Sequence, residues 1–287
     1  MRRPDPVVLA VFVVTVLVGG SNFVAVRFSN RELAPLWGAT LRIGASGILL
    51  LVLALLARVR LPSGRALIGA LLFGLWNFGV GYALTYLGLV AAPAALAASI
   101  VAVVPLLTLF IAAANGLERI TVRRLAGACV AILGIGVIFA DQISLAVPLG
   151  SIATVVALAI VIASATVFAK RLPQTHPIGT NAVAMPIGAA LLLVVAAFAG
   201  ERFALPTRID VWVAVVYLVF STIALFVGFF FIVQRWAASA TSYTTVLNPI
   251  VTVALGTALA GEAVSLTFIG GAALVMAGTY IGALAPA

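Results

Sequence analysis

Long apolar runs separated by short polar segments extend along the whole chain. Each run approaches the roughly 20 apolar residues that a helix needs to cross the hydrocarbon core of a bilayer. Because the apolar positions are continuous and do not alternate with polar ones, the pattern predicts helices and excludes an outer-membrane barrel. The predicted helices span residues 7–28, 33–57, 66–89, 93–113, 122–140, 148–169, 177–199, 209–233, 239–260 and 266–284. We therefore expect an all-α, polytopic membrane protein with ten transmembrane helices.

Composition supports the same class of protein. Of the 287 residues, 64% are hydrophobic and 8% are charged, whereas soluble domains carry about 25% charged residues. This excludes soluble enzymes, disordered tails and nucleic-acid-binding modules. The first run follows Arg2 and Arg3, as in a signal peptide, but it is too long and lacks a small-residue cleavage site, so we expect it to remain as the first helix. The single cysteine, Cys129, excludes an intrachain disulfide.

The basic residues predict the orientation. Of the sixteen Lys and Arg residues, eleven lie on the N-terminal side of the predicted helices, four lie on the opposite side, and Arg42 lies within the second helix. Cytoplasmic loops carry an excess of Lys and Arg. We therefore interpret the net charge of +9 as orientation charge and expect both termini in the cytoplasm, in a bacterial-type inner (plasma) membrane.

An internal repeat appears when the chain is compared with itself at an offset of 144 residues. The offset aligns Pro105 with Pro249, Thr108 with Thr252, Glu118 with Glu262, Gly127 with Gly271, and Gly134 with Gly278. This predicts two five-helix repeats, residues 1–143 and 144–287. Because five is odd, the second repeat would be inverted relative to the first, which is an architecture of transporters that work by alternating access. A duplicated scaffold that transports nothing is the alternative.

The junctions between the fourth and fifth helices of each repeat carry a family resemblance. The first reads Asn115-Gly-Leu-Glu-Arg-Ile-Thr121, followed by Gly127 and Gly134-Ile-Gly136, and the second reads Gly261-Glu-Ala-Val-Ser265, followed by Gly270, Gly271 and Gly278. The chain resembles the drug/metabolite transporter superfamily, in particular its EamA-type ten-helix exporters, and is most similar to bacterial exporters of aromatic amino acids. This implies an inner-membrane carrier with its cavity between two halves.

The same junctions also have a structural interpretation. Glu118 and Glu262 directly precede the fifth and tenth helices, where a carboxylate complements the positive end of the helix dipole. Thr121 and Ser265 are candidate N-caps for those helices. Each of the two helices also carries a pair of glycines seven residues apart on one face, which favours close helix packing.

The sequence does not support a catalytic site or a metal site. The seven acidic residues all fall outside or at the ends of the predicted helices, and the only histidine, His176, lies in a short loop. A mid-membrane proton relay, a general base or a metal site would need such groups within the bundle. We therefore predict no catalytic residue, no metal site and no cofactor, and a protein that is not an enzyme.

Uncharged polar and aromatic side chains at membrane depth are the candidates for substrate binding. Buried amides need partners, so they should face the bundle interior or a wet cavity; contact between helices is the alternative. Aromatic residues at positions 78, 82 and 86 form a stripe, matched at the repeat offset by Phe226 and Phe230, and both stripes could hold a flat apolar ligand or simply pack. The predicted cavity residues are Asn22, Trp76, Asn77, Tyr82, Ser99, Ser164, Phe226, Tyr243 and Asn248.

Two prolines and one arginine complete the set. Pro105 and Pro249 each remove a backbone donor within an apolar run, so we expect flexible points in the helices there, with a tolerated kink as the alternative. Arg42 could bind a substrate carboxylate. It could also extend to the outer interface near Trp37, which is the interpretation that the sequence favours slightly.

Together these features predict an exporter of small amphipathic metabolites, first among them aromatic or other hydrophobic amino acids. Its partners would be the small-molecule substrate and the lipid bilayer, and a monomer is plausible. The alternatives are an exporter of other metabolites, such as threonine or homoserine, and a non-transporting membrane scaffold. Export of a drug-like cation is disfavoured, because it would need a carboxylate within the membrane.

Overall fold

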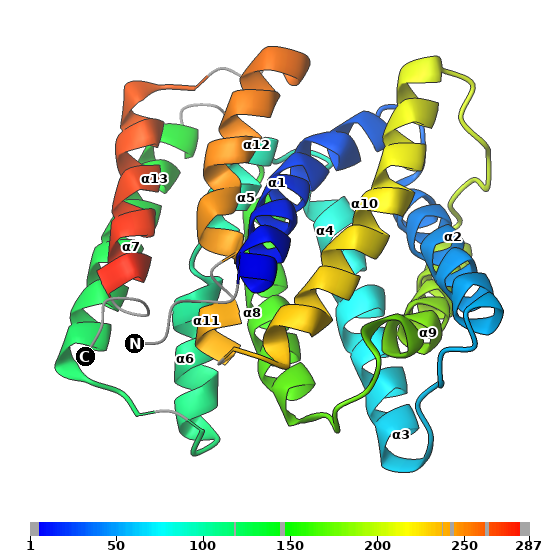
Figure 1. Cartoon of the computed structure of the whole chain (residues 1–287). Coiled ribbons are helices and arrows are strands. Elements are labelled where there is room, and N and C mark those ends of the chain that lie inside the picture. The colour runs from blue at the N-terminus through cyan, green and yellow to red at the C-terminus, as the bar shows by residue number, and fades with distance from the viewer. Residues whose placement is uncertain are drawn as a thin grey trace.

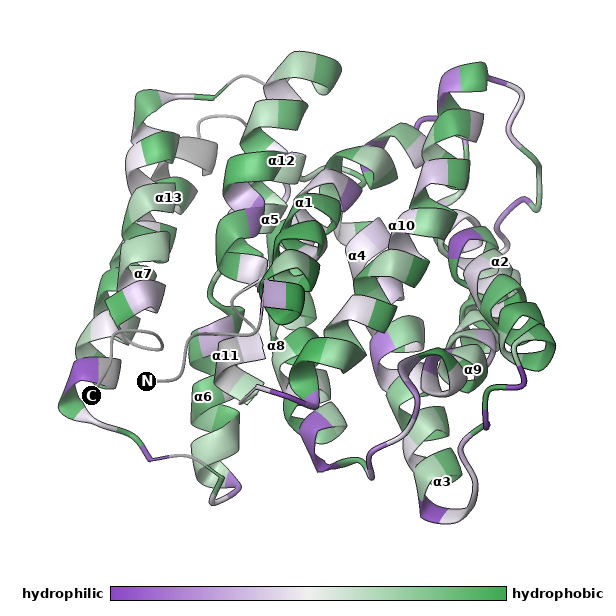
Figure 2. Ribbon diagram, in the orientation of Figure 1, coloured by the Kyte–Doolittle hydropathy of each residue, from purple (hydrophilic) through white to green (hydrophobic). Residues whose placement is uncertain are grey.

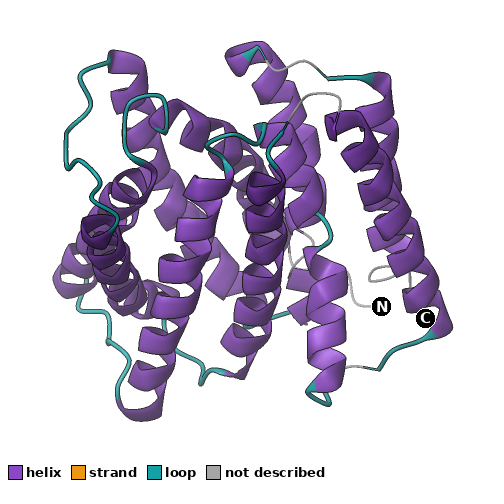
Figure 3. Ribbon diagram, turned by 180° about the vertical axis from the view of Figure 1, so that it is seen from behind, coloured by secondary structure: helices purple, strands orange, loops and turns teal. Residues whose placement is uncertain are grey.

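The regular structure of the chain is helical throughout the part that the computed structural model describes (Figures 1 and 3). The described residues are 6–117, 119–143, 147–236, 238–241, 244–261 and 264–281. The helices are α1 (Pro6–Ser29), α2 (Pro35–Leu56), α3 (Gly64–Phe73), η1 (Gly74–Gly81), α4 (Tyr82–Gly88), α5 (Ala94–Val101), α6 (Val104–Ala114), α7 (Val122–Ile143), α8 (Leu149–Arg171), α9 (Pro177–Phe198), α10 (Ile209–Val233), α11 (Ala238–Thr241), α12 (Thr244–Ala260) and α13 (Leu266–Thr279).

The outer surface of these helices is suited to lipid. Seven helical stretches among the described residues are long and apolar enough to cross a membrane, and three shorter apolar helices accompany them. Large apolar side chains such as Ile48, Leu133 and Phe220 are more than half exposed on the outside. Figure 2 shows apolar residues covering most of the helices and hydrophilic ones gathered near the helix ends and in the connections. The chain is thus a membrane protein by its surface as well as by its composition.

The sequence marks many helix boundaries directly. Pro35 and Pro177 open α2 and α9, where the missing backbone N–H has no intrahelical partner to lose. Gly116 and Gly261 follow α6 and α12 with φ values of 72° and 64°, a left-handed conformation that glycine adopts without steric cost. Ser265 caps α13 as expected, since its Oγ accepts a hydrogen bond from the Phe268 N–H at 2.9 Å. Glu118 and Glu262 lie outside the described residues.

The third apolar run is a single helical stretch with an unusual centre. Between α3 and α4 the backbone is a π-helix over the eight residues of η1. This segment packs closely on α9: a Cβ added to Gly74 would lie 2.2 Å from the carbonyl oxygen of Ala184, and one added to Gly188 would lie 2.4 Å from Cβ of Phe78. π-Helical turns are rare in proteins, and those that occur often lie at functional sites.

The two prolines differ in their surroundings. The helix before Pro105 is interrupted: α5 ends at Val101, and α6 begins at Val104 with the proline in its first turn. Pro249, in contrast, lies inside α12, which continues across it. A proline disfavours helical backbone in the residue that precedes it, but only the first site shows a break.

The two halves of the chain interlock. The first helix, α1, packs mainly on α10 and α12 from the second half, and α8, the first helix of the second half, packs on α4 and α6 from the first half. Two further pairs join the halves, α2 with α9 and α7 with α13, and the second pair stands side by side at the edge of the molecule in Figure 1. Neither half therefore buries its own helices as a separate bundle.

Helices α7 and α13 meet through the predicted glycines. A Cβ added to Gly278 would lie 2.6 Å from the carbonyl oxygen of Gly127, and one added to Gly134 would lie 2.7 Å from that of Gly271. Residue numbers rise along one helix as they fall along the other, so the pair is antiparallel. The contact is also reciprocal. At the repeat offset Gly127 is equivalent to Gly271 and Gly134 to Gly278, and the contacts join Gly127 to Gly278 and Gly134 to Gly271.

Polar contacts join the two halves where α1 leads into α2 and α9 leads into α10. The Glu201 carboxylate accepts hydrogen bonds from the backbone N–H groups of Leu36 and Trp37, at 3.1 and 2.8 Å, in the first turn of α2. Glu32 accepts from the backbone N–H and the hydroxyl of Thr207 and from the N–H of Arg208. These hydrogen bonds, with that of the Thr207 hydroxyl contributing most, hold the pKa of the Glu32 carboxyl below its usual value.

Candidate functional site

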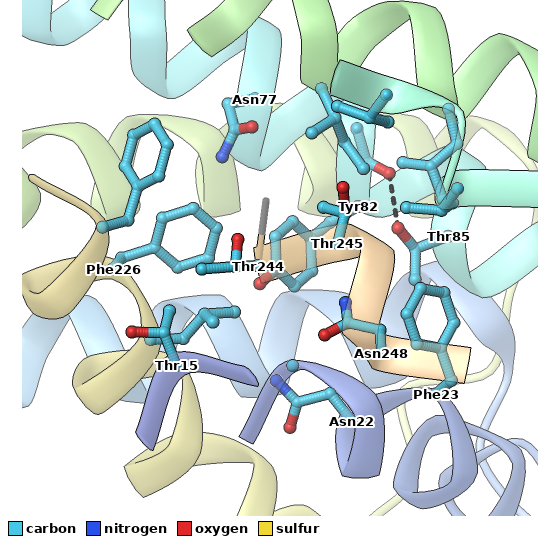
Figure 4. Close-up of a pocket in the computed structure, with 18 of the residues that line it drawn as sticks. Thr15, Asn22, Phe23, Asn77, Tyr82, Thr85, Phe226, Thr244, Thr245 and Asn248 are labelled. Atoms are coloured by element: carbon cyan, nitrogen blue, oxygen red, sulfur yellow. Dashed lines mark hydrogen bonds between the residues drawn. The ribbon is translucent and has the colours of Figure 1, made fainter. Parts of the chain in front are cut away.

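A cavity lies among helices from both halves of the chain (Figure 4). Residues of α1, α2, η1, α4, α5, α6, α8, α10, α11 and α12 line it. The volume of the cavity that is open to water is about 140 Å³. By the same measure one water needs roughly 10–15 Å³, so the cavity can hold several waters or a small solute.

Aromatic rings form one wall of the cavity. Tyr82 of α4 and Phe226 of α10 both line it, with ring centroids 6.1 Å apart. Phe226 also meets Phe229 at 6.1 Å and Phe78 at 4.5 Å, each in an edge-on arrangement. Such offset and edge-to-face pairs are the favoured contacts between aromatic rings. The wall is therefore an ordered aromatic surface that a flat apolar group could join.

Three amides face the cavity with part of their hydrogen-bonding capacity unused. Asn22 of α1 accepts a hydrogen bond from Ser221 at 2.7 Å through Oδ1, but its Nδ2 has no partner among the described residues. The Nδ2 of Asn77 and the Oδ1 of Asn248 are likewise buried without a partner in this part of the chain. Figure 4 shows the three amides around the ring of Tyr82, with Asn77 across the cavity from Asn22 and Asn248. A buried polar group without a partner is costly, so these atoms are suited to a solute or to water.

Arg42 lines the cavity and is 2% exposed. Its Nε donates a hydrogen bond of 2.6 Å to Oγ1 of Thr222 in α10, and its guanidinium lies over the Tyr82 ring, 4.9 Å from the centroid. The expectation that this side chain extends to the outer interface near Trp37 is therefore wrong. Trp37 lies in the first turn of α2, where its Nε1 donates a hydrogen bond to the carbonyl oxygen of Ala204.

Other predicted residues lie elsewhere. Trp76 is 44% exposed, and its Nε1 donates to Oγ of Ser164 at 2.8 Å, so the two bond to each other away from the cavity. Ser99 is buried, and its hydroxyl donates to the backbone of Ala95. Neighbouring positions on a helix point in different directions, which is why Asn77 lines the cavity and Trp76 does not. Tyr243 lies outside the described residues. Neither Pro105 nor Pro249 lines the cavity.

Threonines are the cavity residues that the sequence interpretation missed. Those lining it are Thr15, Thr85, Thr166, Thr241, Thr244 and Thr245. A signal was present in the spacing: residues 241, 244, 245 and 248 recur at the intervals that place side chains on one helix face. Thr15 precedes Asn22 by seven residues on the same face of α1.

Acidic side chains among the described residues do not gather at the cavity. None of the described residues that line the cavity is Asp or Glu. Within the described part of the chain, no group of three or more His, Cys, Asp or Glu side chains could hold a metal ion. The polar chemistry of the cavity is thus supplied by amides, hydroxyls and one guanidinium.

A solved structure and several sequences are similar to this chain. The structure, described as "Crystal structure of protein", aligns with a TM-score of 0.70 over 97% of this chain and 98% of its own length at 20% identity, which shows a shared fold. The "Uncharacterized inner membrane transporter YedA" of Escherichia coli (strain K12) is 32% identical over 256 residues, 87% of this chain and 81% of the relative. An "Uncharacterized transporter" of Archaeoglobus fulgidus is 28% identical over 278 residues, 94% of this chain and 96% of the relative.

The family match covers nearly the whole chain. The sequence pattern of the EamA-like transporter family fits twice, at residues 6–140 and again at residues 149–283. The two matched segments fall in the two repeats that the sequence predicts, and helices from both contribute to the cavity. The chain belongs to the EamA-like transporter family and is a membrane transporter.

Proposed function

We propose that this transporter exports small amphipathic metabolites, with aromatic or other hydrophobic amino acids as its main substrates. The observation that carries the proposal is the cavity, in which the aromatic wall of Tyr82 and Phe226 faces amides with unused hydrogen-bonding groups. An aromatic amino acid presents one flat apolar end and one polar end. The cavity offers a surface for each.

The mechanism that we propose is alternating access between two inverted repeats of five transmembrane helices each, residues 1–143 and 144–287. In this view α5 with α6 forms the fourth crossing, α11 with α12 forms the ninth, and α13 is the tenth. The double family match and the reciprocal contact of α7 with α13 support the repeat. Inverted repeats that enclose a central binding site are a common basis of alternating access.

The proposed location is a bacterial-type inner membrane with both termini in the cytoplasm. The printed name of the Escherichia coli relative supports the membrane. The excess of Lys and Arg on the N-terminal side supports the orientation. This orientation would put the contacts of Glu32 and Glu201 at the periplasmic face.

Reconstitution in proteoliposomes tests the substrate. Vesicles preloaded with radiolabelled phenylalanine, tryptophan or threonine would be followed for efflux, with and without a pH gradient. We expect efflux of the aromatic amino acids above that of protein-free vesicles. The variant Phe226→Ala should slow it several-fold, because an aromatic contact contributes about 0.5–1.5 kcal/mol beyond its buried area.

Phe220→Ala is the matched control, since Phe220 lies on the same helix but is 58% exposed on the outside. It should transport like the parent protein. Efflux that responds equally to both substitutions would contradict the role of the aromatic wall, and the absence of aromatic efflux would contradict the proposed substrate.

A small polar amino acid such as threonine is the second candidate. The cavity volume of about 140 Å³ favours it, because small-molecule sites are typically about 300–1,000 Å³. Efflux of threonine without that of phenylalanine, in the same vesicles, would replace the first candidate with the second.

A further inference from the structure

Arg42 carries a buried positive charge for which the described part of the chain supplies no carboxylate partner. The side chain is 2% exposed and lies within the helix bundle of a membrane protein. Its described hydrogen bond uses one donor, Nε, out of the five that a guanidinium carries. Lysine in such a place could lose its proton, but arginine keeps its charge in proteins. The positive charge therefore persists whenever the cavity is empty.

The described carboxylates are engaged elsewhere. Glu201 accepts from backbone N–H groups at the start of α2, and Glu32 accepts from those between α9 and α10. Asp210 pairs with Arg208 at 2.9 Å and with Arg31 at 3.3 Å. The contacts that the structure gives to Arg42 are instead neutral: the Thr222 hydroxyl, the face of the Tyr82 ring and the side chain of Tyr86. These contacts stabilise a cation, but none of them cancels its charge.

The cavity does not offer an equivalent partner for an ammonium group. Its described lining contains no Asp or Glu, so a bound amine would meet only oxygens of amides, hydroxyls and the backbone. The unpartnered amide atoms of the described lining are two donors, Asn22 Nδ2 and Asn77 Nδ2, and one acceptor, Asn248 Oδ1. The polar groups of the cavity are therefore better suited to an anion than to a cation.

We propose that Arg42 binds the carboxylate of the transported solute and that the cavity selects for this carboxylate and not for the amine. The substrate class is then a monocarboxylate with an apolar or aromatic body, with or without an amino group. The guanidinium supplies planar donors that match carboxylate geometry, and the Tyr82 ring beneath it continues into the Phe226 side of the cavity. This inference rests on the proposed function and specifies the recognition at its site.

Three probes with the same phenylethyl body separate the two charged groups. They are 3-phenylpropionate, which has only the carboxylate, L-phenylalanine, which has both groups, and 2-phenylethylamine, which has only the amine. Binding of each radiolabelled probe would be measured at pH 7 by equilibrium dialysis against purified full-length protein in lipid nanodiscs. We expect the two carboxylates to bind within about threefold of each other and the amine to bind at least about tenfold more weakly.

Variants of Arg42 test whether this side chain is responsible. Arg42→Gln should weaken both carboxylates about tenfold or more and leave the amine unchanged, and Arg42→Lys should restore part of the loss. Arg235→Gln is the matched control, because Arg235 lies at the exposed end of α10 and donates to the backbone of Phe231. That variant should bind all three probes like the parent protein.

Each outcome has a definite meaning. The proposal is overturned if 2-phenylethylamine binds as tightly as 3-phenylpropionate, or if folded Arg42→Gln retains the parent affinity for carboxylates. The ranking of the three probes on the unmodified protein needs no variant, so it decides the matter even if Arg42→Gln does not fold. If the unmodified protein binds none of the probes, the proposed aromatic substrate itself fails, whereas tight binding without carboxylate selectivity overturns only the role of Arg42.

Discussion

At the scale of single residues, the amide of Asn248 depends on the absence of a side chain on α1. A Cβ added to Gly19 would lie 2.9 Å from Oδ1 and 3.1 Å from Nδ2 of Asn248. Because these atoms are the end of a flexible side chain, Gly19→Ala should displace the amide while the fold persists. We expect substrate affinity to fall about three- to tenfold, the value of one hydrogen bond, with little change in melting temperature. Binding and thermal unfolding of the purified variant would check this.

Gly44→Ala is the control for that substitution. A Cβ at Gly44 would lie 3.7 Å from the Cβ of Ala189, an ordinary van der Waals contact. Alanine also favours a helix interior over glycine by about 0.5–1 kcal/mol. This variant should bind substrate normally and melt no lower than the parent protein. Equal losses of affinity in both variants would show that the Asn248 contact is not the cause.

The sequence identified five of the cavity residues, Asn22, Asn77 and Asn248 as amides at membrane depth, and Tyr82 and Phe226 by the spacing of the aromatic stripes. An amide is costly in lipid, so an amide at membrane depth is expected to face the interior of the helix bundle. The same rule fails for an indole or a single hydroxyl, which can form a bond at the outer surface, as Trp76 and Ser164 do with each other. The sequence favoured the wrong one of two placements for Arg42, because its partners Thr222 and Tyr82 are distant along the chain.

At the scale of helices, the pairing of α7 with α13 depends on glycine. A Cβ on Gly278 would lie 2.3 Å from the backbone nitrogen of Ala131, and backbone cannot move aside cheaply. Gly278→Ala should therefore lower the free energy of unfolding by about 1–3 kcal/mol, the usual cost of overpacking. Gly270→Ala, on the same helix with nothing within 4 Å, should cost nothing. Denaturant unfolding in mixed micelles compares the two, and equal stability would refute the close contact.

The contact between Glu32 and Thr207 gives a pH-dependent prediction. Because folding lowers the pKa of Glu32, its ionised form stabilises the protein fully above the pKa of the unfolded chain, and this stabilisation is lost as the pH falls through the lower folded value. Glu32→Gln should therefore melt below the parent protein at pH 7. The difference should stay constant down to about pH 5 and shrink below about pH 4.

Thr207→Val serves as the companion variant, because the Thr207 hydroxyl makes the largest contribution to lowering the pKa of Glu32. It should reproduce part of the effect at pH 7. A difference in melting temperature that grows on acidification would contradict the assignment.

Most helix boundaries could be predicted from sequence because proline, glycine and charged residues mark them. The π-helical centre of the third run could not. It occurs where Gly74 and Gly188 bring two backbones together, and that contact involves residues more than a hundred positions apart. The break between α5 and α6 has a local cause in Pro105, whereas α12 shows that a proline does not always produce one.

At the scale of the whole molecule, the interlocking of the halves predicts how the chain can be divided. Because α1 packs mainly on α10 and α12, and α8 packs on α4 and α6, each half alone leaves these helices without partners. Two fragments separated in the connection between α7 and α8 should each fail to bind substrate when produced singly, and should regain binding when produced together. Co-purification and ligand binding would measure this, with a flexible insertion at the same point as control. Binding by either fragment alone would contradict it.

The repeat at an offset of 144 residues predicted two related halves. It did not predict that helices of each half would pack mainly on helices of the other. Identities between equivalent positions show which residues share a role, and they say nothing about which half provides the neighbours. The interlocked arrangement follows from packing between residues far apart in sequence, for which one chain carries no direct signal.

The hydrogen bond between Asn22 and Ser221 has a consequence for how the protein is made. The two residues are 199 positions apart, one near the beginning of synthesis and the other late in it. At about 5–20 residues per second, a ribosome needs roughly 10–40 s to pass from one to the other. For that time the first helix exists without the hydrogen-bond partner of its amide, and the binding site becomes complete only after the ninth hydrophobic run, which carries Asn248, has also emerged.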